Sequence, residues 1–104
     1  MVFAVDFDGT ICEIAYPDIG KPKLRVIERL KELKRQEHKL ILNTCREGKS
    51  LDEAVKWCSE YGLFFDAHNE NLPERIAEFG GNCRKISADF YIDDKNLFME
   101  GVNG

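Results

Sequence analysis

Short apolar runs that each end in polar residues alternate with amphipathic helical patterns along this chain of 104 residues. The apolar runs, typical of buried strands, are found at 2–7, 40–42, 63–67 and 90–92. The patterns with helical spacing between them are found at 24–37, 50–61 and 73–79. This alternation predicts an α/β fold with three layers, in which helices flank a Rossmann-like parallel sheet of about four strands.

The length allows one small domain over residues 1–104 and leaves no room for a second. No apolar run approaches the roughly 20 residues that a membrane-spanning helix needs. The N-terminus runs directly into Asp6 and Asp8 without a basic leader, which is unlike a signal peptide. We therefore expect a soluble, cytoplasmic protein.

The cysteines are widely spaced, at Cys12, Cys45, Cys58 and Cys83, with no Cys-x-x-Cys pair among them. With only two histidines in the chain, this spacing argues against structural zinc. A disulfide framework would need a secreted context. We expect reduced and mostly buried thiols.

Charge is unevenly distributed in this chain, whose formal net charge is −4. Residues 21–39 hold eight Lys or Arg against three Glu, so the remainder is strongly acidic. An acidic remainder argues against a dedicated nucleic-acid-binding domain. The basic stretch fits the solvent-exposed face of a helix, although Lys21, Lys23 and Arg25 could instead help attract an anionic substrate.

Polar side chains follow three of the four predicted strands. The pairs are Asp6 with Asp8, Thr44 with Arg46, and Asp93 with Asp94. Because parallel strands end at one edge of the sheet, these groups should meet there. Four carboxylates in one crevice repel one another unless a cation lies among them, and oxygen ligands without a His or Cys pair favour Mg²⁺.

The remaining side chains in this set suit a phosphate group. Thr44 supplies a hydroxyl, Arg46 a planar charged fork and Lys85 a point charge. Gly9 suggests a turn that sends Asp6 and Asp8 in different directions. One carboxylate could then attack a phosphoryl group, while the other protonates the leaving alcohol and later activates water.

Four segments resemble the motifs of the haloacid dehalogenase superfamily of phosphotransferases. Asp6-Phe7-Asp8-Gly9-Thr10 is similar to its first motif, and the strand ending at Thr44 is similar to its second. Lys85 stands where the third motif has its lysine, and the run ending in Asp93-Asp94 resembles the fourth motif. The resemblance covers nearly the whole chain and implies a hydrolase core domain over residues 1–104.

The resemblance also implies residue roles. Asp6 would be the nucleophile and a metal ligand, and Asp8 the general acid/base, with its backbone carbonyl facing the metal. Thr44 and Lys85 would hold the phosphoryl group. Asp94 would bind Mg²⁺ directly, and Asp93 would support it or act through water. Arg46 resembles the arginine that lies near the substrate in nucleotidase and polynucleotide-phosphatase relatives.

The spacing of the motifs leaves no room for the cap domain that the family usually inserts. The chain also stops ten residues after Asp94, so an extra strand that commonly follows is expected to be absent or supplied by another subunit. An open site favours a large substrate, or a homo-oligomer in which a neighbouring subunit serves as the lid. The candidates are a nucleotide, a sugar phosphate or a phosphate-ended polymer.

The expected activity is that of a Mg²⁺-dependent phosphomonoesterase working through an aspartyl phosphate on Asp6. Two alternatives stay open. One is a non-catalytic module that binds phosphate and Mg²⁺. The other is a phosphotransferase whose acceptor is a molecule other than water.

Overall fold

The computed structural model describes residues 1–70, 72 and 88–93. Its elements are, in chain order, β1 (Val2–Val5), α1 (Leu24–Arg35), β2 (Lys39–Leu42), α2 (Gly48–Glu60), β3 (Ala67–His68) and β4 (Phe90–Ile92). The helix predicted at 73–79, together with Lys85 and Asp94, lies outside the described residues.

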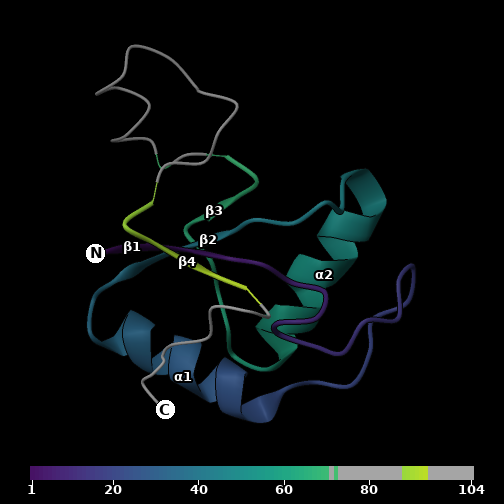
Figure 1. Cartoon of the computed structure of the whole chain (residues 1–104), viewed down its shortest axis with the longest axis horizontal. Helices are drawn as coiled ribbons and strands as arrows, with labels where there is room; N and C mark the ends of the chain where they lie inside the picture. The colour runs from purple at the N-terminus through teal and green to yellow at the C-terminus, as the bar shows by residue number, and fades with distance from the viewer. Residues whose placement is uncertain (71, 73–87, 94–104) are drawn as a thin grey trace.

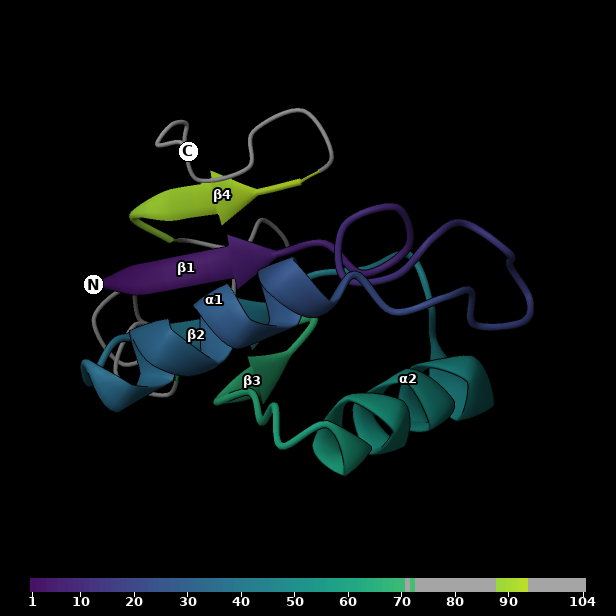
Figure 2. The ribbon, with the colours of Figure 1, turned by 90° about the horizontal axis from the view of Figure 1, so that it is seen from below.

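The four strands form one sheet in the order β3-β2-β1-β4, and every neighbouring pair is parallel (Figure 2). Val5 at the end of β1 is in register with Leu42 of β2 and with Ile92 of β4. The predicted α/β class and parallel sheet are therefore confirmed, and the strand ends lie at one edge.

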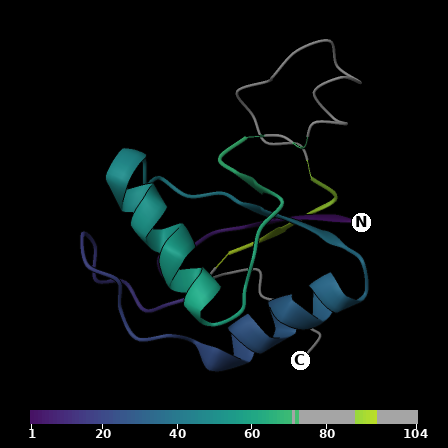
Figure 3. The same cartoon turned by 180° about the vertical axis from the view of Figure 1, so that it is seen from behind.

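One face of the sheet packs against both helices (Figures 1 and 3). The side chains alternate along the strands, so Val5, Leu40 and Leu42 face the helices. The helices contribute the apolar stripe that the sequence pattern predicts, which comprises Val26, Ile27 and Leu30 from α1 and Ala54 and Cys58 from α2.

The opposite face of the sheet carries a second, smaller apolar cluster. Val2, Ala4, Ile41 and Ala67 form it together with Leu72, and all five side chains are buried. Strand residues that are apolar on both faces are typical of parallel sheets, because such sheets are covered on both sides.

Some element boundaries differ from the sequence-based predictions. The first strand ends at Val5 and not at residue 7, because the amides of Thr10 and Ile11 both donate to the Phe7 carbonyl and turn the chain. The third strand is Ala67–His68 and not 63–67. The preceding Leu63 is buried against the helices without joining the sheet.

The second helix begins two residues earlier than the predicted range of 50–61. Its first residue is Gly48, and Glu47 stands at the cap position. Ser50 still takes part, because its hydroxyl donates to the Glu47 carbonyl over 2.8 Å and accepts from the Glu47 amide at 3.3 Å. The predicted helix is therefore confirmed, and the contacts between Glu47 and Ser50 define its first turn.

Within the described part of the chain, no helix is long and apolar enough to cross a membrane. The same residues form the sheet and its two helices with no cap domain inserted among them.

Candidate active site

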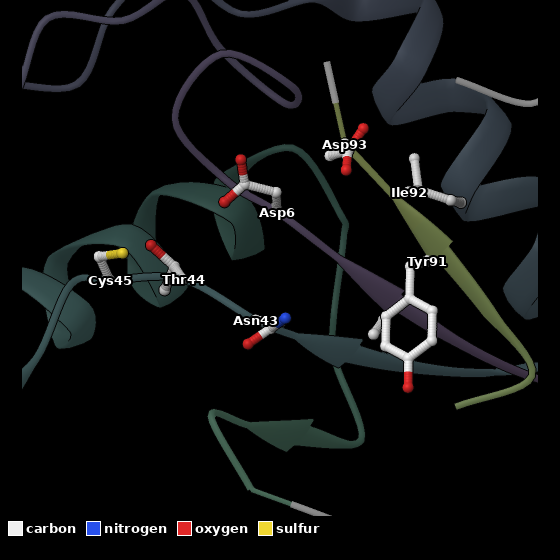
Figure 4. A pocket seen from close by; sticks show the side chains of 8 residues that line it. Asp6, Asn43, Thr44, Cys45, Tyr91, Ile92 and Asp93 are labelled. Carbon is white, nitrogen blue, oxygen red and sulfur yellow. The ribbon is translucent and has the colours of Figure 1, made fainter. Parts of the chain in front are cut away.

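A pocket of about 400 Å³ opens at the carboxyl edge of the sheet (Figure 4). The described residues that line it are Ala4, Asp6, Asn43, Thr44, Cys45, Tyr91, Ile92 and Asp93. Figure 4 shows the Asp6 carboxylate between Thr44 and Asp93, each at the end of a different strand. The pocket thus brings together three of the predicted site residues.

Backbone hydrogen bonds beyond the strands hold the strand ends in place. The Asp6 amide donates to the Ile92 carbonyl at 2.9 Å, and the Asn43 amide donates to the Val5 carbonyl at 2.8 Å. These contacts extend the sheet by one residue and fix the backbone from which the Asp6 side chain enters the pocket.

A tight turn follows Asp8 directly, as Gly9 suggested. Gly9 has a φ of 90°, a conformation that costs glycine little because it lacks a Cβ. The Lys23 ammonium donates to the Gly9 carbonyl at 2.8 Å and ties this turn to the start of α1. Phe7, between the two aspartates, is fully buried. The two carboxylates therefore have different surroundings.

Asp8 is paired with Arg46 and is absent from the pocket lining. Arg46 Nε donates to Asp8 Oδ2 at 2.9 Å, and an Arg46 terminal nitrogen donates to Asp8 Oδ1 at 2.8 Å. This bidentate geometry is the strongest form of an arginine–carboxylate contact. The Asp8 carboxylate raises the pKa of Arg46 above its usual value, against the opposing effect of burial.

Arg46 itself is a buried anchor, with its side chain only 1% exposed. Its guanidinium also donates to the carbonyls of Pro17 and Asp18, at 3.3 Å and 2.8 Å. It lies about 5 Å from the ring centroids of both Phe7 and Tyr16. The sequence suggested a substrate contact for Arg46, whereas the structure directs it to Asp8 and to the loop that contains Pro17 and Asp18.

Asn69 is a structural residue of the site whose role the sequence did not reveal. Its Oδ1 accepts from the Thr44 amide at 2.7 Å, and its Nδ2 donates to the Arg46 carbonyl at 2.9 Å. Asn69 has a φ of 54°, which asparagine tolerates better than most residues. The sequence feature that could have indicated this role is the position of Asn69 directly after a short strand, β3.

Cys45 was also missed, because the sequence pattern predicted mostly buried thiols. Cys12 and Cys58 are indeed buried, whereas Cys45 is exposed and lines the pocket. Burial raises the pKa of the Cys12 thiol, and it raises that of Cys58 to about 12. Cys83 lies outside the described residues.

The basic stretch divides between structural and surface roles. Lys23 supports the turn after Asp8, while Lys34 pairs with Asp66 and Arg35 pairs with Glu32. The lining of the pocket includes no lysine or arginine among the described residues.

The chemistry of the pocket lining fits a hard cation. Asp6 and Asp93 offer carboxylate oxygens, and Thr44 offers a hydroxyl. Within residues 1–70, 72 and 88–93, no three acidic, His or Cys side chains gather into a metal site. Mg²⁺ commonly binds proteins through one or two carboxylates and completes its shell with water and substrate phosphate.

Comparison with known proteins gives one close match. No family model and no curated protein matches the chain. A solved structure of a conserved protein from Bacteroides thetaiotaomicron is similar, with 49% sequence identity and a TM-score of 0.82. The match covers 93% of this chain and 78% of that one. Identity this high over nearly the whole chain shows that the protein belongs to the same family as this conserved Bacteroides protein.

Proposed function

We propose that the protein is a Mg²⁺-dependent phosphohydrolase that transfers a phosphoryl group to Asp6 and then to water. The observation that carries the proposal is the pocket at the carboxyl edge, where Asp6, Thr44 and Asp93 converge from three strands. Ligand sites of open parallel sheets lie at this edge.

Asp6 and Asp93 are the described residues that would hold the metal ion. When bound, Mg²⁺ would neutralise the two carboxylates and make the pocket attractive to a phosphate. Lys85 and Asp94, which the motif resemblance adds to the phosphate and metal sites, lie outside the described residues.

The chain's own residues would act in two steps. In the first, an Asp6 carboxylate oxygen bonds to phosphorus while the bond to the leaving group breaks, and the Thr44 hydroxyl donates to a phosphoryl oxygen. In the second, water attacks the phosphoaspartate and regenerates the Asp6 carboxylate. Covalent catalysis of this kind divides one difficult displacement into two easier ones.

A second candidate function is a non-catalytic module that binds phosphate and Mg²⁺. The observation that favours it is the pairing of Asp8, the expected acid/base, with Arg46 outside the pocket lining. Such a module would keep Asp6 and Thr44 as ligands and carry out no turnover.

Hydrolysis of p-nitrophenyl phosphate, with and without Mg²⁺, tests the enzymatic proposal. Asp6→Asn keeps the shape of the side chain but removes the nucleophile, so turnover should fall by about 10³-fold or more. The matched control is Asp52→Asn, on the exposed surface of α2, which should retain the wild-type rate. Equal rates for wild type and Asp6→Asn, with and without Mg²⁺, would contradict the proposal.

The exposed thiol of Cys45 offers a separate measure of binding. In a Cys83→Ser background, the rate at which a thiol reagent modifies Cys45 should fall when Mg²⁺ and orthovanadate occupy the pocket, because Cys45 lines it. Protection of Cys45 without turnover of any phosphate ester would favour the binding module over the enzyme.

A further inference from the structure

A second pocket, of about 240 Å³, lies away from the carboxyl edge of the sheet. Lys31, Lys34 and Arg35 from the C-terminal half of α1 line it, together with Gly62 and Phe64 from the connection between α2 and β3. This connection runs beside α1 (Figures 1 and 3). The described lining residues of the two pockets do not overlap, so this pocket is a separate site.

The fold holds two of the three cations at the wall of this pocket. The Lys31 ammonium lies over Gly62, 3.4 Å from the position that a Cβ there would occupy. The Lys34 ammonium donates to both carboxylate oxygens of Asp66 at 2.9 Å. The side chains of Lys31 and Lys34 are only 26% and 31% exposed, so their stems are packed and their charged ends have a defined place.

Lys31 and Arg35 keep hydrogen-bond donors for a ligand, although each has a carboxylate partner. Lys31 pairs with Glu28 at 3.2 Å, and Arg35 pairs with Glu32 at 2.9 Å. An ammonium group has three donors and a guanidinium has five, and exposed ion pairs of this kind are weak. No acidic residue is among the described residues that line the pocket. An anion in the pocket can therefore share or take over these two cations.

Phe64 gives the pocket an aromatic wall. Its side chain is 61% exposed, whereas the preceding Leu63 is buried in the core. An exposed phenyl ring beside cations offers a flat apolar group a surface on which to stack. The pocket thus combines a stacking surface with positively charged groups.

The helix dipole explains only part of this arrangement. Lys34 and Arg35 lie in the last turn of α1, where cations compensate the partial negative charge of the helix carbonyls. Lys31 lies one turn earlier, and Phe64 comes from a different segment of the chain. The dipole does not account for an exposed aromatic ring beside these cations, whereas a ligand with an anionic and an aromatic part does.

We propose that this pocket binds a small organic anion that carries an aromatic ring, with the ring on Phe64 and the anionic group at Lys31 and Arg35. Its volume is below the roughly 300–1,000 Å³ of typical ligand pockets, which suits a small metabolite and not a large cofactor. Nucleoside monophosphates and aromatic carboxylates share this chemistry. The inference does not depend on the proposed phosphoryl transfer to Asp6.

An NMR titration of the wild-type protein tests the proposal, with the backbone amides of Gly62 and Phe64 as reporters. Two probes combine an aromatic ring with an anionic group, and each is compared with its own halves. AMP is compared with adenosine and inorganic phosphate, and phenylacetate is compared with benzyl alcohol and acetate. EDTA removes the Mg²⁺ that the proposed hydrolysis of AMP would need.

We expect AMP or phenylacetate to shift both reporter amides with a Kd at least about 10-fold lower than that of either of its halves. The affinity should fall as NaCl is added, because salt screens the charges of the site. The ratio of the two affinities distinguishes a nucleotide from an aromatic carboxylate. Shifts confined to the amides of Asn43 and Cys45 would place the probe in the candidate active site and overturn the inference, as would equal affinity for a probe and its anionic half.

Phe64→Leu is the deciding variant, because leucine keeps an apolar side chain but has no aromatic face. It should weaken binding of the tighter probe by about 5-fold or more. Lys31→Gln keeps most of the stem of the lysine but removes its charge, so it should weaken binding by a similar factor and reduce the dependence on salt.

Lys56→Gln is the matched control, since Lys56 is an exposed lysine of α2 that does not line the pocket. It should leave both the affinity and its salt dependence at the wild-type values. Affinity that is unchanged in Phe64→Leu would contradict the stacking on Phe64. Losses of equal size in Lys31→Gln and Lys56→Gln would show attraction by net charge alone and would also overturn the inference.

Discussion

At the scale of single residues, a few polar side chains connect segments that are distant in the sequence. The Arg46 guanidinium donates hydrogen bonds to Asp8 and to the carbonyls of Pro17 and Asp18. The Asn69 side chain accepts from the Thr44 amide and donates to the Arg46 carbonyl. Each contact satisfies a polar group that would otherwise be costly to bury. The same residues therefore shape the pocket and stabilise the fold around it.

Asp66 is a residue of this kind away from the pocket. Its carboxylate accepts from the Lys34 ammonium at 2.9 Å and from the Leu40 amide at 2.8 Å, which ties α1 to β2. Partial burial acts to raise the pKa of Asp66. The hydrogen bonds from Leu40 and Lys34, together with the charges of Lys34 and Lys39, outweigh it and lower the pKa below 3.8.

We therefore predict that Asp66→Asn lowers the free energy of unfolding by about 1–2 kcal/mol at neutral pH. A depressed pKa in the folded state stabilises the fold above the unfolded pKa of about 4, and this contribution is lost as pH falls through the folded value. The difference between wild type and variant should shrink below about pH 4. Urea unfolding at several pH values measures it, and a difference independent of pH would contradict the explanation.

At the scale of elements, the end of α2 shows how local sequence can specify a boundary completely. Gly62 has a φ of 78°, its amide donates to the Ser59 carbonyl, and the Leu63 amide donates to the Cys58 carbonyl. These are the two hydrogen bonds of a Schellman cap. Leu63 then packs beside Cys58 in the core, which is the apolar contact that accompanies this motif.

Gly62→Ala should therefore lower the free energy of unfolding by about 1 kcal/mol, because an added Cβ disfavours the left-handed conformation. Space is not the obstacle, since the added Cβ would meet only the end of the Lys31 side chain at 3.4 Å. Chemical unfolding followed by far-UV circular dichroism measures the effect. The control is Glu53→Ala on the exposed surface of α2, and an equally small change in both variants would count against the strained-cap explanation.

At the scale of the whole molecule, the core divides the thiols into two classes. Cys12 and Cys58 lie in the main apolar cluster between sheet and helices, whereas Cys45 lies at the exposed carboxyl edge. The thiolate is the reactive form of cysteine, so a raised pKa together with burial makes a thiol inert. Reactivity of the two buried thiols therefore reports on opening of the fold.

In a Cys45→Ser/Cys83→Ser variant, we predict that Cys12 and Cys58 react with a thiol reagent only as fast as the molecule opens. Their modification should accelerate with urea in parallel with the loss of circular dichroism, because both residues sit in one cooperative core. The Cys83→Ser protein, which retains Cys45, should react at once at that thiol. Rapid modification of Cys12 or Cys58 in native buffer would disprove the assignment of both to the core.

The sequence by itself determined the alternation of strands and helices, the parallel sheet, and the arrival of Asp6, Thr44 and Asp93 at one edge. These follow from periodicity and from the geometry of parallel strands, which are local or topological rules. The sequence pattern determined the boundaries of the elements less closely. The strand predicted at 63–67 is β3 at Ala67–His68, because Leu63 packs against the helices and does not pair with a neighbouring strand.

Only the tertiary structure decided where Asp8, Arg46, Cys45 and Asn69 act. Asp8 and Arg46 are 38 residues apart, and no periodic pattern records whether a carboxylate faces a pocket or a buried guanidinium. The two residues meet only when the turn after β1 packs beside the end of β2. The buried charge of Arg46 then needs an opposite charge nearby, and Asp8 supplies it. The assembled fold, and not the motif, therefore directs Asp8 away from the pocket.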